Sequence, residues 1–153
     1  TGPKGSKELS LNDKIFAATI VDDKSLILKL IKKNEDSNIL WGTARSIINS
    51  AIIGVSSGYE KILELNGVGF RAILKENILN LQIGFSHTIS YKIPEGIKVI
   101  LEKNTIIKIS GIDKELVGKV SSEIKMLKPV EPYKAKGIKE RGQYVLRKEG
   151  KKK

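Results

Sequence analysis

The sequence of 153 residues has no cysteine and a single histidine, His87. The lack of cysteine excludes disulfides, thiolate metal ligands and a cysteine nucleophile. One histidine is too few for a His-rich metal cluster or a two-histidine zinc motif. No partner base or nucleophile stands at a readable spacing from His87, which we interpret as a local hydrogen-bonding residue. These absences argue against an enzyme, and we expect no cofactor and no metal.

Long apolar runs are also missing. No segment approaches the roughly 20 apolar residues that a membrane-spanning helix needs, and no signal peptide is recognisable. Hydrophobic residues nevertheless make up 40% of the chain, which is enough for a packed core. The length suits one ordinary domain or two small ones.

Positive charge is abundant, because the formal net charge is +11. Residues 131–153 hold nine Lys and Arg against three Glu and few apolar residues. We therefore expect a tail that builds no core of its own and gains order only on a partner. Nucleic acid is the commonest polyanion that neutralises such a stretch, and an anionic membrane surface is the next. A solvated tail that binds nothing is the remaining alternative.

Hydrophobic periodicity predicts a strand, a hairpin and a helix in the first third of the chain. Leu9 and Leu11 alternate with polar residues as in a strand edge, and residues 15–21 and 25–30 form the expected hairpin. Residues 38–53 change to helical spacing, with Ser37 or Asn38 as the cap and Gly54 as the end. We interpret Trp41 as a core anchor of this helix, with base stacking as the alternative.

Strands return after residue 58. The predicted strands are residues 59–65, 70–74, 78–83, 88–93, 97–101 and 105–109. A second helix fits residues 114–127, capped by Asp113, with Val117, Val120, Ile124 and Leu127 facing inward and Pro129 beyond its end. Gly67, Val68 and Gly69 lie between two strands, so they predict a tight bend and not a phosphate-binding loop, which joins a strand to a helix.

The two halves repeat one order of elements. An offset of 80 residues aligns residues 8–10 with 88–90, and in each half a hairpin then leads into a helix. We predict an α+β fold of two similar domains, each an antiparallel β-sheet with a helix packed on one face and its own core, plus a basic C-terminal tail. The predicted divisions are residues 1–57, 58–128 and 129–153.

Several motifs resemble one known family. They are Gly42-Thr43-Ala44-Arg45, Gly54-Val55, Gly67-Val68-Gly69-Phe70-Arg71-Ala72, Gly84-Phe85-Ser86-His87, Pro94-Glu95-Gly96-Ile97 and the tail Glu131-Pro132-Tyr133-Lys134-Ala135-Lys136-Gly137-Ile138. Together with the glycine turn of residues 1–5, they resemble, in order along the chain, ribosomal protein six of the large subunit. The chain departs from the family pattern at Val130 (usually Pro), Ala135 (usually Gly) and residues 139–140 (usually Arg and an aromatic).

The resemblance implies a structural protein of the large ribosomal subunit that binds large-subunit rRNA near the sarcin–ricin loop. Its partners would be this rRNA, neighbouring ribosomal proteins and translation factors docking nearby, with no membrane. It implies a cytoplasmic ribosome, or alternatively a mitochondrial or plastid one. Family members also begin with a further strand-forming segment. Either the first predicted domain lacks this edge strand, or the segment lies outside the 153 residues. A free-standing nucleic-acid-binding module is the alternative function.

The candidate rRNA-binding residues are mostly in the tail. They are Tyr133, Lys134, Lys136, Gly137, Lys139, Arg141, Arg147, Lys148, Lys151, Lys152, Lys153 and, beside the glycine bend, Arg71. Lys and Arg release condensed counterions when they meet phosphates. Gly137 would let the backbone approach the RNA, and Tyr133 would either stack on a base or pack beneath the second helix. We also predict a short terminal strand over residues 143–147.

Overall fold

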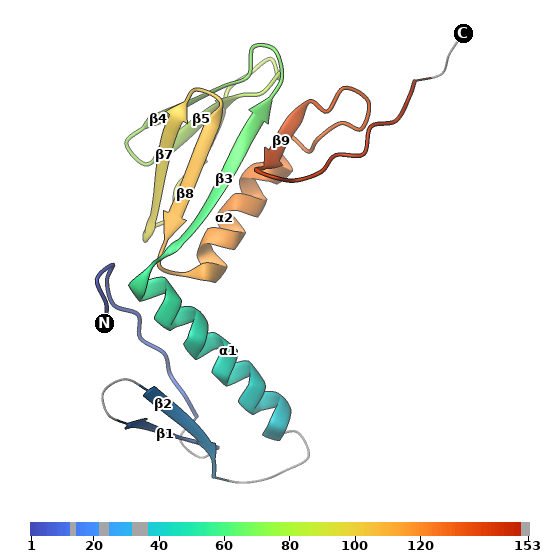
Figure 1. The fold of residues 1–153 in the computed structure, drawn as a ribbon. Coiled ribbons are helices and arrows are strands. Elements are labelled where there is room, and N and C mark those ends of the chain that lie inside the picture. The colour runs from blue at the N-terminus through green and yellow to red at the C-terminus, as the bar shows by residue number, and fades with distance from the viewer. Residues whose placement is uncertain (13–14, 22–24, 32–36, 151–153) are drawn as a thin grey trace. The chain divides into compact units, whose positions relative to one another are not determined.

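The computed structural model describes residues 1–12, 15–21, 25–31 and 37–150. The chain forms two compact units, Thr1–Ser57 and Gly58–Lys153, which are described separately (Figure 1). Lys151, Lys152 and Lys153, which we predicted to bind rRNA, lie outside the described residues.

The first unit contains one hairpin and one long helix. Strands β1 (Phe16–Val21) and β2 (Ser25–Leu30) pair antiparallel, and helix α1 spans Ser37–Ser56. The indole N–H of Trp41 donates to the carbonyl oxygen of Leu28 at 2.9 Å, which ties α1 to β2. At the other end of α1, the backbone N–H of Lys4 donates to the carbonyl of Val55 at 3.0 Å.

Few side chains of the first unit are buried. Among its described residues, the buried apolar ones are Ala44, Ile48 and Ala51, each 7–9% exposed, whereas Ile20 and Ile39 are 71% and 69% exposed. The expectation that the first half closes a core of its own is therefore wrong for the part of this unit that the structure describes.

The second unit contains two antiparallel sheets. The larger one has the order β7-β8-β3-β9, and the smaller one has the order β4-β5-β6. Their strands are β3 (Tyr59–Asn66), β4 (Arg71–Lys75), β5 (Ile78–Gln82), β6 (Ile89–Lys92), β7 (Ile97–Lys103), β8 (Ile106–Gly111) and β9 (Gly137–Glu140). Helix α2 spans Lys114–Leu127, as predicted, and its N-cap Asp113 accepts a hydrogen bond from the backbone N–H of Glu115 at 3.0 Å.

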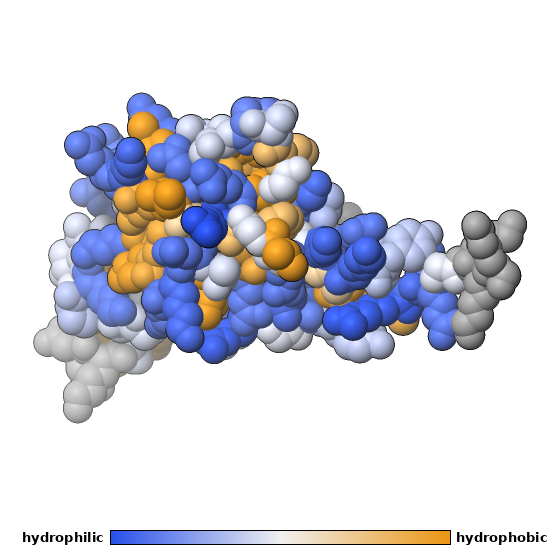
Figure 2. Space-filling view, turned by 90° about the horizontal axis from the view of Figure 1, so that it is seen from above, coloured by the Kyte–Doolittle hydropathy of each residue, from blue (hydrophilic) through white to orange (hydrophobic). Residues whose placement is uncertain are grey.

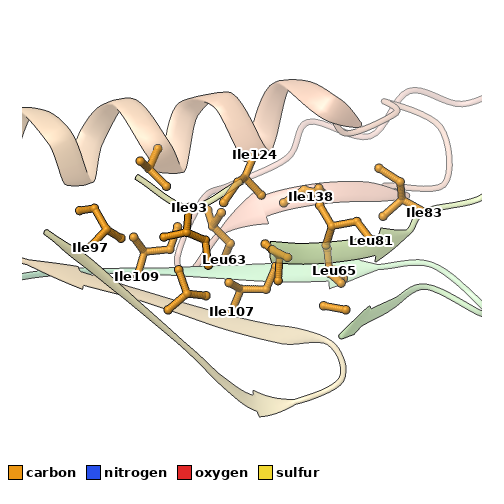
Figure 3. Close-up of a cluster of buried hydrophobic side chains, with 14 of the residues drawn as sticks. Leu63, Leu65, Leu81, Ile83, Ile93, Ile97, Ile107, Ile109, Ile124 and Ile138 are labelled. Carbon is orange, nitrogen blue, oxygen red and sulfur yellow. The ribbon is translucent and has the colours of Figure 1, made fainter. Parts of the chain in front are cut away.

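One core joins these elements. Leu63 of β3 and Ile107 and Ile109 of β8 lie on the same face of the larger sheet, since side chains alternate along a strand. Leu81 of the smaller sheet and Ile124 of α2 complete a cluster in which all five side chains are fully buried (Figure 3). Apolar surface removed from water stabilises this unit by about 25 cal/mol per Å².

The opposite face of the larger sheet is polar and ion-paired. The ammonium of Lys108 lies 2.7 Å from a carboxylate oxygen of Glu102 and 3.4 Å from one of Glu60. The hydrogen bond with Lys108 lowers the pKa of Glu102, and the same contact raises the pKa of Lys108. Since these groups are exposed, the pairs add little to stability and keep this face in contact with water.

The predicted α+β class is confirmed, because antiparallel sheets and two helices make up the fold, and the hairpin-then-helix order occurs twice. Three local predictions are wrong. Residues 6–12 form no strand, α1 continues past Gly54 to Ser56, and residues 143–147 form no strand. The strand near the C-terminus is β9 instead, which pairs with β3 in the larger sheet.

Candidate nucleic-acid interface

The C-terminal segment is shaped by the protein itself between residues 129 and 141. The backbone N–H of Glu131 donates to the carbonyl of Lys136 at 2.8 Å, and that of Ala135 donates to the carbonyl of Glu131 at 3.0 Å. These two hydrogen bonds close a compact loop over residues 131–136, which we call the tail loop. The N–H of Ile138 then donates to the carbonyl of Lys128 at 2.9 Å, where α2 has just ended. The expectation that the whole tail gains order only on a partner is therefore wrong for these residues.

Burial of Ile138 explains why the tail folds back. Ile138 is 0% exposed and belongs to the same core cluster as Leu63 and Leu65 of β3 (Figure 3). One apolar residue with four paired backbone positions thus anchors a segment that is otherwise highly charged.

The anchored loop presents three of the predicted site residues to solvent. Lys134 and Lys136 are exposed, and Tyr133 is 54% exposed, which leaves both ammonium groups and the ring accessible. Ala135 between the two lysines points inward and is buried. The alternation therefore turns both cationic side chains outward from a fixed backbone.

Gly137 is explained by packing inside the protein. Its φ is +140°, and a Cβ added there would lie 2.6 Å from the carbonyl oxygen of Pro129 and 2.7 Å from the Cα of Val130. A glycine is therefore required here by close approach of two segments of the chain, and the expected approach of RNA at Gly137 stays a prediction. Ala135 has a φ of +54°, in the left-handed region that favours glycine, which accounts for the glycine usual at this position in the family that the sequence resembles.

Lys139 and Arg141 are paired within the protein. The ammonium of Lys139 lies 3.1 Å from one carboxylate oxygen of Glu64, and Nε of Arg141 lies 3.7 Å from the other. The side chain of Lys139 is 25% exposed and that of Arg141 is 59% exposed. Of the two, Arg141 has more of its charge available to a partner.

The remaining tail residues follow the loop closely. Arg147 and Lys148 are exposed, and the backbone N–H of Lys148 donates to the carbonyl of Pro132 at 2.9 Å. This hydrogen bond brings the end of the described chain back beside the loop that carries Lys134 and Lys136.

Arg71 and the tail loop lie at the same end of the second unit. Arg71 starts β4 opposite Gln82, the last residue of β5, and Gly137 starts β9 opposite Asn66, the last residue of β3. The bend that joins β3 to β4 contains Gly69 with a φ of +80°, which confirms the interpretation of these glycines as a turn. Figure 2 looks onto this end, where hydrophobic residues lie among hydrophilic ones.

Three residues at this end were not assigned to the interface from the sequence. The rings of Phe85 and His87 stack with their centroids 6.1 Å apart and their planes 21° apart. The ammonium of Lys128 lies 4.5 Å from the centroid of the Phe85 ring. In the sequence these rings could be recognised as Phe85 and His87, separated by the small residue Ser86. From the sequence, this segment served only as a motif of the family resemblance.

In the described residues, no group of three or more His, Asp or Glu side chains is placed to hold a metal ion. Neither α1 nor α2 is long and apolar enough to cross a membrane.

The fold and this surface define a class of protein: an α+β scaffold that presents lysines, arginines and exposed rings from loops at one end, as nucleic-acid-binding proteins do. Comparison with known proteins is more specific. The family model described as Ribosomal protein L6 matches residues 66–141.

Relatives match almost the whole chain. A large ribosomal subunit protein uL6 of Novosphingobium aromaticivorans is 43% identical over 152 residues, which are 99% of this chain and 85% of that protein. The uL6 of Nautilia profundicola is 43% identical over 97% of this chain and 83% of its own length. The large ribosomal subunit protein uL6c of Guillardia theta is 46% identical over 98% of this chain and 83% of its own. The chain belongs to the ribosomal protein L6 family, and it is a structural ribosomal protein and not an enzyme.

Proposed function

We propose that this protein is a structural component of the large ribosomal subunit and binds large-subunit rRNA through residues 129–153 together with Arg71. The relatives are large ribosomal subunit proteins, which supports assignment to the large subunit. The anchored loop with outward-facing Lys134 and Lys136 supports the proposed mode of binding. Folded RNA has a major groove too narrow for side chains, so contacts to phosphates and ribose hydroxyls dominate over base reading.

The observation that carries this proposal is the fixed backbone of the loop. A loop closed by its own hydrogen bonds and anchored by Ile138 loses little conformational freedom when it meets RNA. The cationic side chains are then already placed where phosphates would meet them. Lys139, whose charge is paired with Glu64, contributes less than Lys134 and Lys136.

Removal of charge tests the proposal better than removal of the tail. Deletion of residues 131–153 would take away β9 and the buried Ile138, so a loss of binding would be confounded by a loss of folding. The double variant Lys134→Ser, Lys136→Ser leaves both in place. We expect weaker binding to protein-free large-subunit rRNA, and a salt dependence reduced by about 0.7–0.9 in slope for each phosphate that the variant no longer neutralises.

A matched control uses two lysines away from the loop. Lys75 at the end of β4 and Lys114 at the start of α2 are exposed, and their double change to serine should leave both affinity and slope nearly unchanged. Equal effects of the two double variants would contradict a specific role for the loop. Sedimentation of a cell lysate distinguishes this proposal from the alternative function. A ribosomal protein should sediment with the large subunit, whereas a free-standing nucleic-acid-binding module should not.

We further propose that the contact lies near the sarcin–ricin loop, beside the docking region of translation factors, as the family resemblance implies. Hydroxyl-radical footprinting of large-subunit rRNA with the bound protein tests this. Protection should centre on the rRNA near that loop, and it should weaken in the Lys134→Ser, Lys136→Ser variant. Protection confined to other rRNA regions would refute the location while leaving rRNA binding intact.

A further inference from the structure

Two exposed rings, Phe85 and His87, and the half-buried Lys128 form a small cluster, which we call the ring platform. Phe85 is 44% exposed and His87 is exposed, with the two rings stacked at 6.1 Å. Lys128 contributes a cation at 4.5 Å from the Phe85 ring. Aromatic residues are only 5% of this sequence, so two stacked rings left in water need an explanation.

The platform is built on rigid parts of the second unit. Ile83, two residues before Phe85, is 0% exposed and belongs to the core. Gly84 has a φ of +78°, and its α-carbon lies against the buried ring of Phe70, where an added Cβ would approach to 3.2 Å. The loop that carries both rings therefore starts from a packed position.

The platform is also joined to the tail loop. Lys128, whose ammonium lies over the Phe85 ring, accepts at its backbone carbonyl the hydrogen bond from the N–H of Ile138 in β9. Arg71 begins β4 opposite Gln82, one residue before Ile83. The rings thus lie next to the basic segment, where a polyanion bound by the tail would reach them.

We propose that the ring platform stacks on an unpaired nucleobase of large-subunit rRNA. This inference rests on the proposed rRNA-binding function and adds a second kind of contact to it. RNA-binding proteins commonly stack splayed-out bases on Phe, Tyr, Trp or His side chains, because every base offers a flat face. Here His87 offers the exposed ring, Phe85 supports it, and Lys128 supplies charge for the adjoining phosphate.

The test compares His87→Ala with His87→Phe in the full-length chain. The probe is protein-free large-subunit rRNA from Novosphingobium aromaticivorans, and affinity is measured by filter binding over a range of salt concentrations. Loss of one stacked base lowers affinity about tenfold. The phenylalanine variant keeps a flat ring and should bind as tightly as the unchanged protein.

The salt dependence distinguishes stacking from charge. Because stacking releases no counterions, His87→Ala should leave the slope of log affinity against log salt unchanged. Lys128→Gln should reduce that slope by about 0.7 if its ammonium meets a phosphate of a single-stranded segment. Ser86→Ala is the matched control, since Ser86 is exposed in the same loop and carries no ring.

Two results would overturn the inference while the proposed function stands. One is unchanged rRNA affinity of His87→Ala beside a Lys134→Ser, Lys136→Ser variant that binds weakly. The other is a His87→Ala protein that binds naked rRNA normally but fails to enter assembled subunits, which would make the platform a contact for a neighbouring protein. Failure of the unchanged protein itself to bind rRNA would refute the proposed function first.

Discussion

Hairpin β7–β8 of the second unit is bordered by β3, whereas hairpin β1–β2 of the first unit forms a two-stranded sheet within the described residues. Both hairpins lead into a helix, yet among the described residues only α2 packs onto a closed core. Exposed Ile20 and Ile39 of the first unit contrast with fully buried Ile107 and Ile124 of the second. A repeated pattern of apolar residues therefore predicts helices and strands, while their burial depends on the strands that flank them.

The largest expected difference between the units comes from the same substitution made in each. Ile138→Ala should lower the free energy of unfolding by about 2–5 kcal/mol, since it leaves a cavity in the core of the second unit. Ile52→Ala in α1, where the side chain is 51% exposed, should change the free energy of unfolding of the first unit by no more than about 0.5 kcal/mol. Urea unfolding followed by circular dichroism measures both.

Trp41, the single tryptophan, reports on the first unit alone in the same experiment. Its fluorescence should respond to urea in Ile138→Ala as it does in the unchanged protein, while the dichroism transition moves to lower urea. If Ile138→Ala shifts the fluorescence and dichroism signals together, the two units unfold as one and do not differ in stability.

A smaller effect on stability is expected from Ala135→Gly, which should increase the difference in stability between the two units. Ala135→Gly relieves a left-handed backbone conformation that disfavours a side chain, so the second unit should gain about 0.5–1 kcal/mol in spite of the greater freedom of glycine when unfolded. The melting temperature of the second unit should rise accordingly. Gly137→Ala is the contrasting variant and should destabilise it, because the new Cβ would meet Pro129.

The smallest expected effect concerns pH. Because the pKa of Glu102 is lowered in the folded protein, its stabilising contribution is present above the pKa of the unfolded chain and is lost as pH falls through the folded value. The raised pKa of Lys108 makes its contribution disappear only as pH rises through the alkaline range. Acidification should therefore lower the stability of the second unit slightly, and so reduce the difference in stability between the two units. Thermal melts of Glu102→Gln should show a smaller loss of stability at acidic pH. An equal loss in that variant would assign the effect to other carboxylates.

Local elements were predictable where one strong signal was enough. Asp113 and the inward face of α2 predicted the second helix with its observed bounds, and turn residues separated the strands of the second unit. Strand β9 was not predictable from its own residues, because its one deeply buried apolar side chain, Ile138, is surrounded by charges in the sequence. Its pairing with β3, about seventy residues earlier, is a long-range contact that local patterns do not encode.

The candidate site was predictable in kind and less so in detail. Charge alone pointed to Lys134 and Lys136, which the structure leaves exposed. The pairing of Lys139 with Glu64 and the internal role of Gly137 depend on segments brought together by folding, so spacing could not reveal them. The same holds for Lys128 and Phe85, which are 43 positions apart and meet only in the folded unit.

The position of β9 after all the other strands of its sheet also orders events during synthesis. While residues 137–140 are still within the translating ribosome, β3 has its partner β8 on one side and an open edge on the other. Until β9 has emerged, a nascent chain therefore lacks the complete four-stranded sheet, and the loop that carries Lys134 and Lys136 is not yet anchored to it. Products of an interrupted message that stop before β9 would lack both the strand that completes the sheet and the loop to which the proposed function assigns rRNA binding.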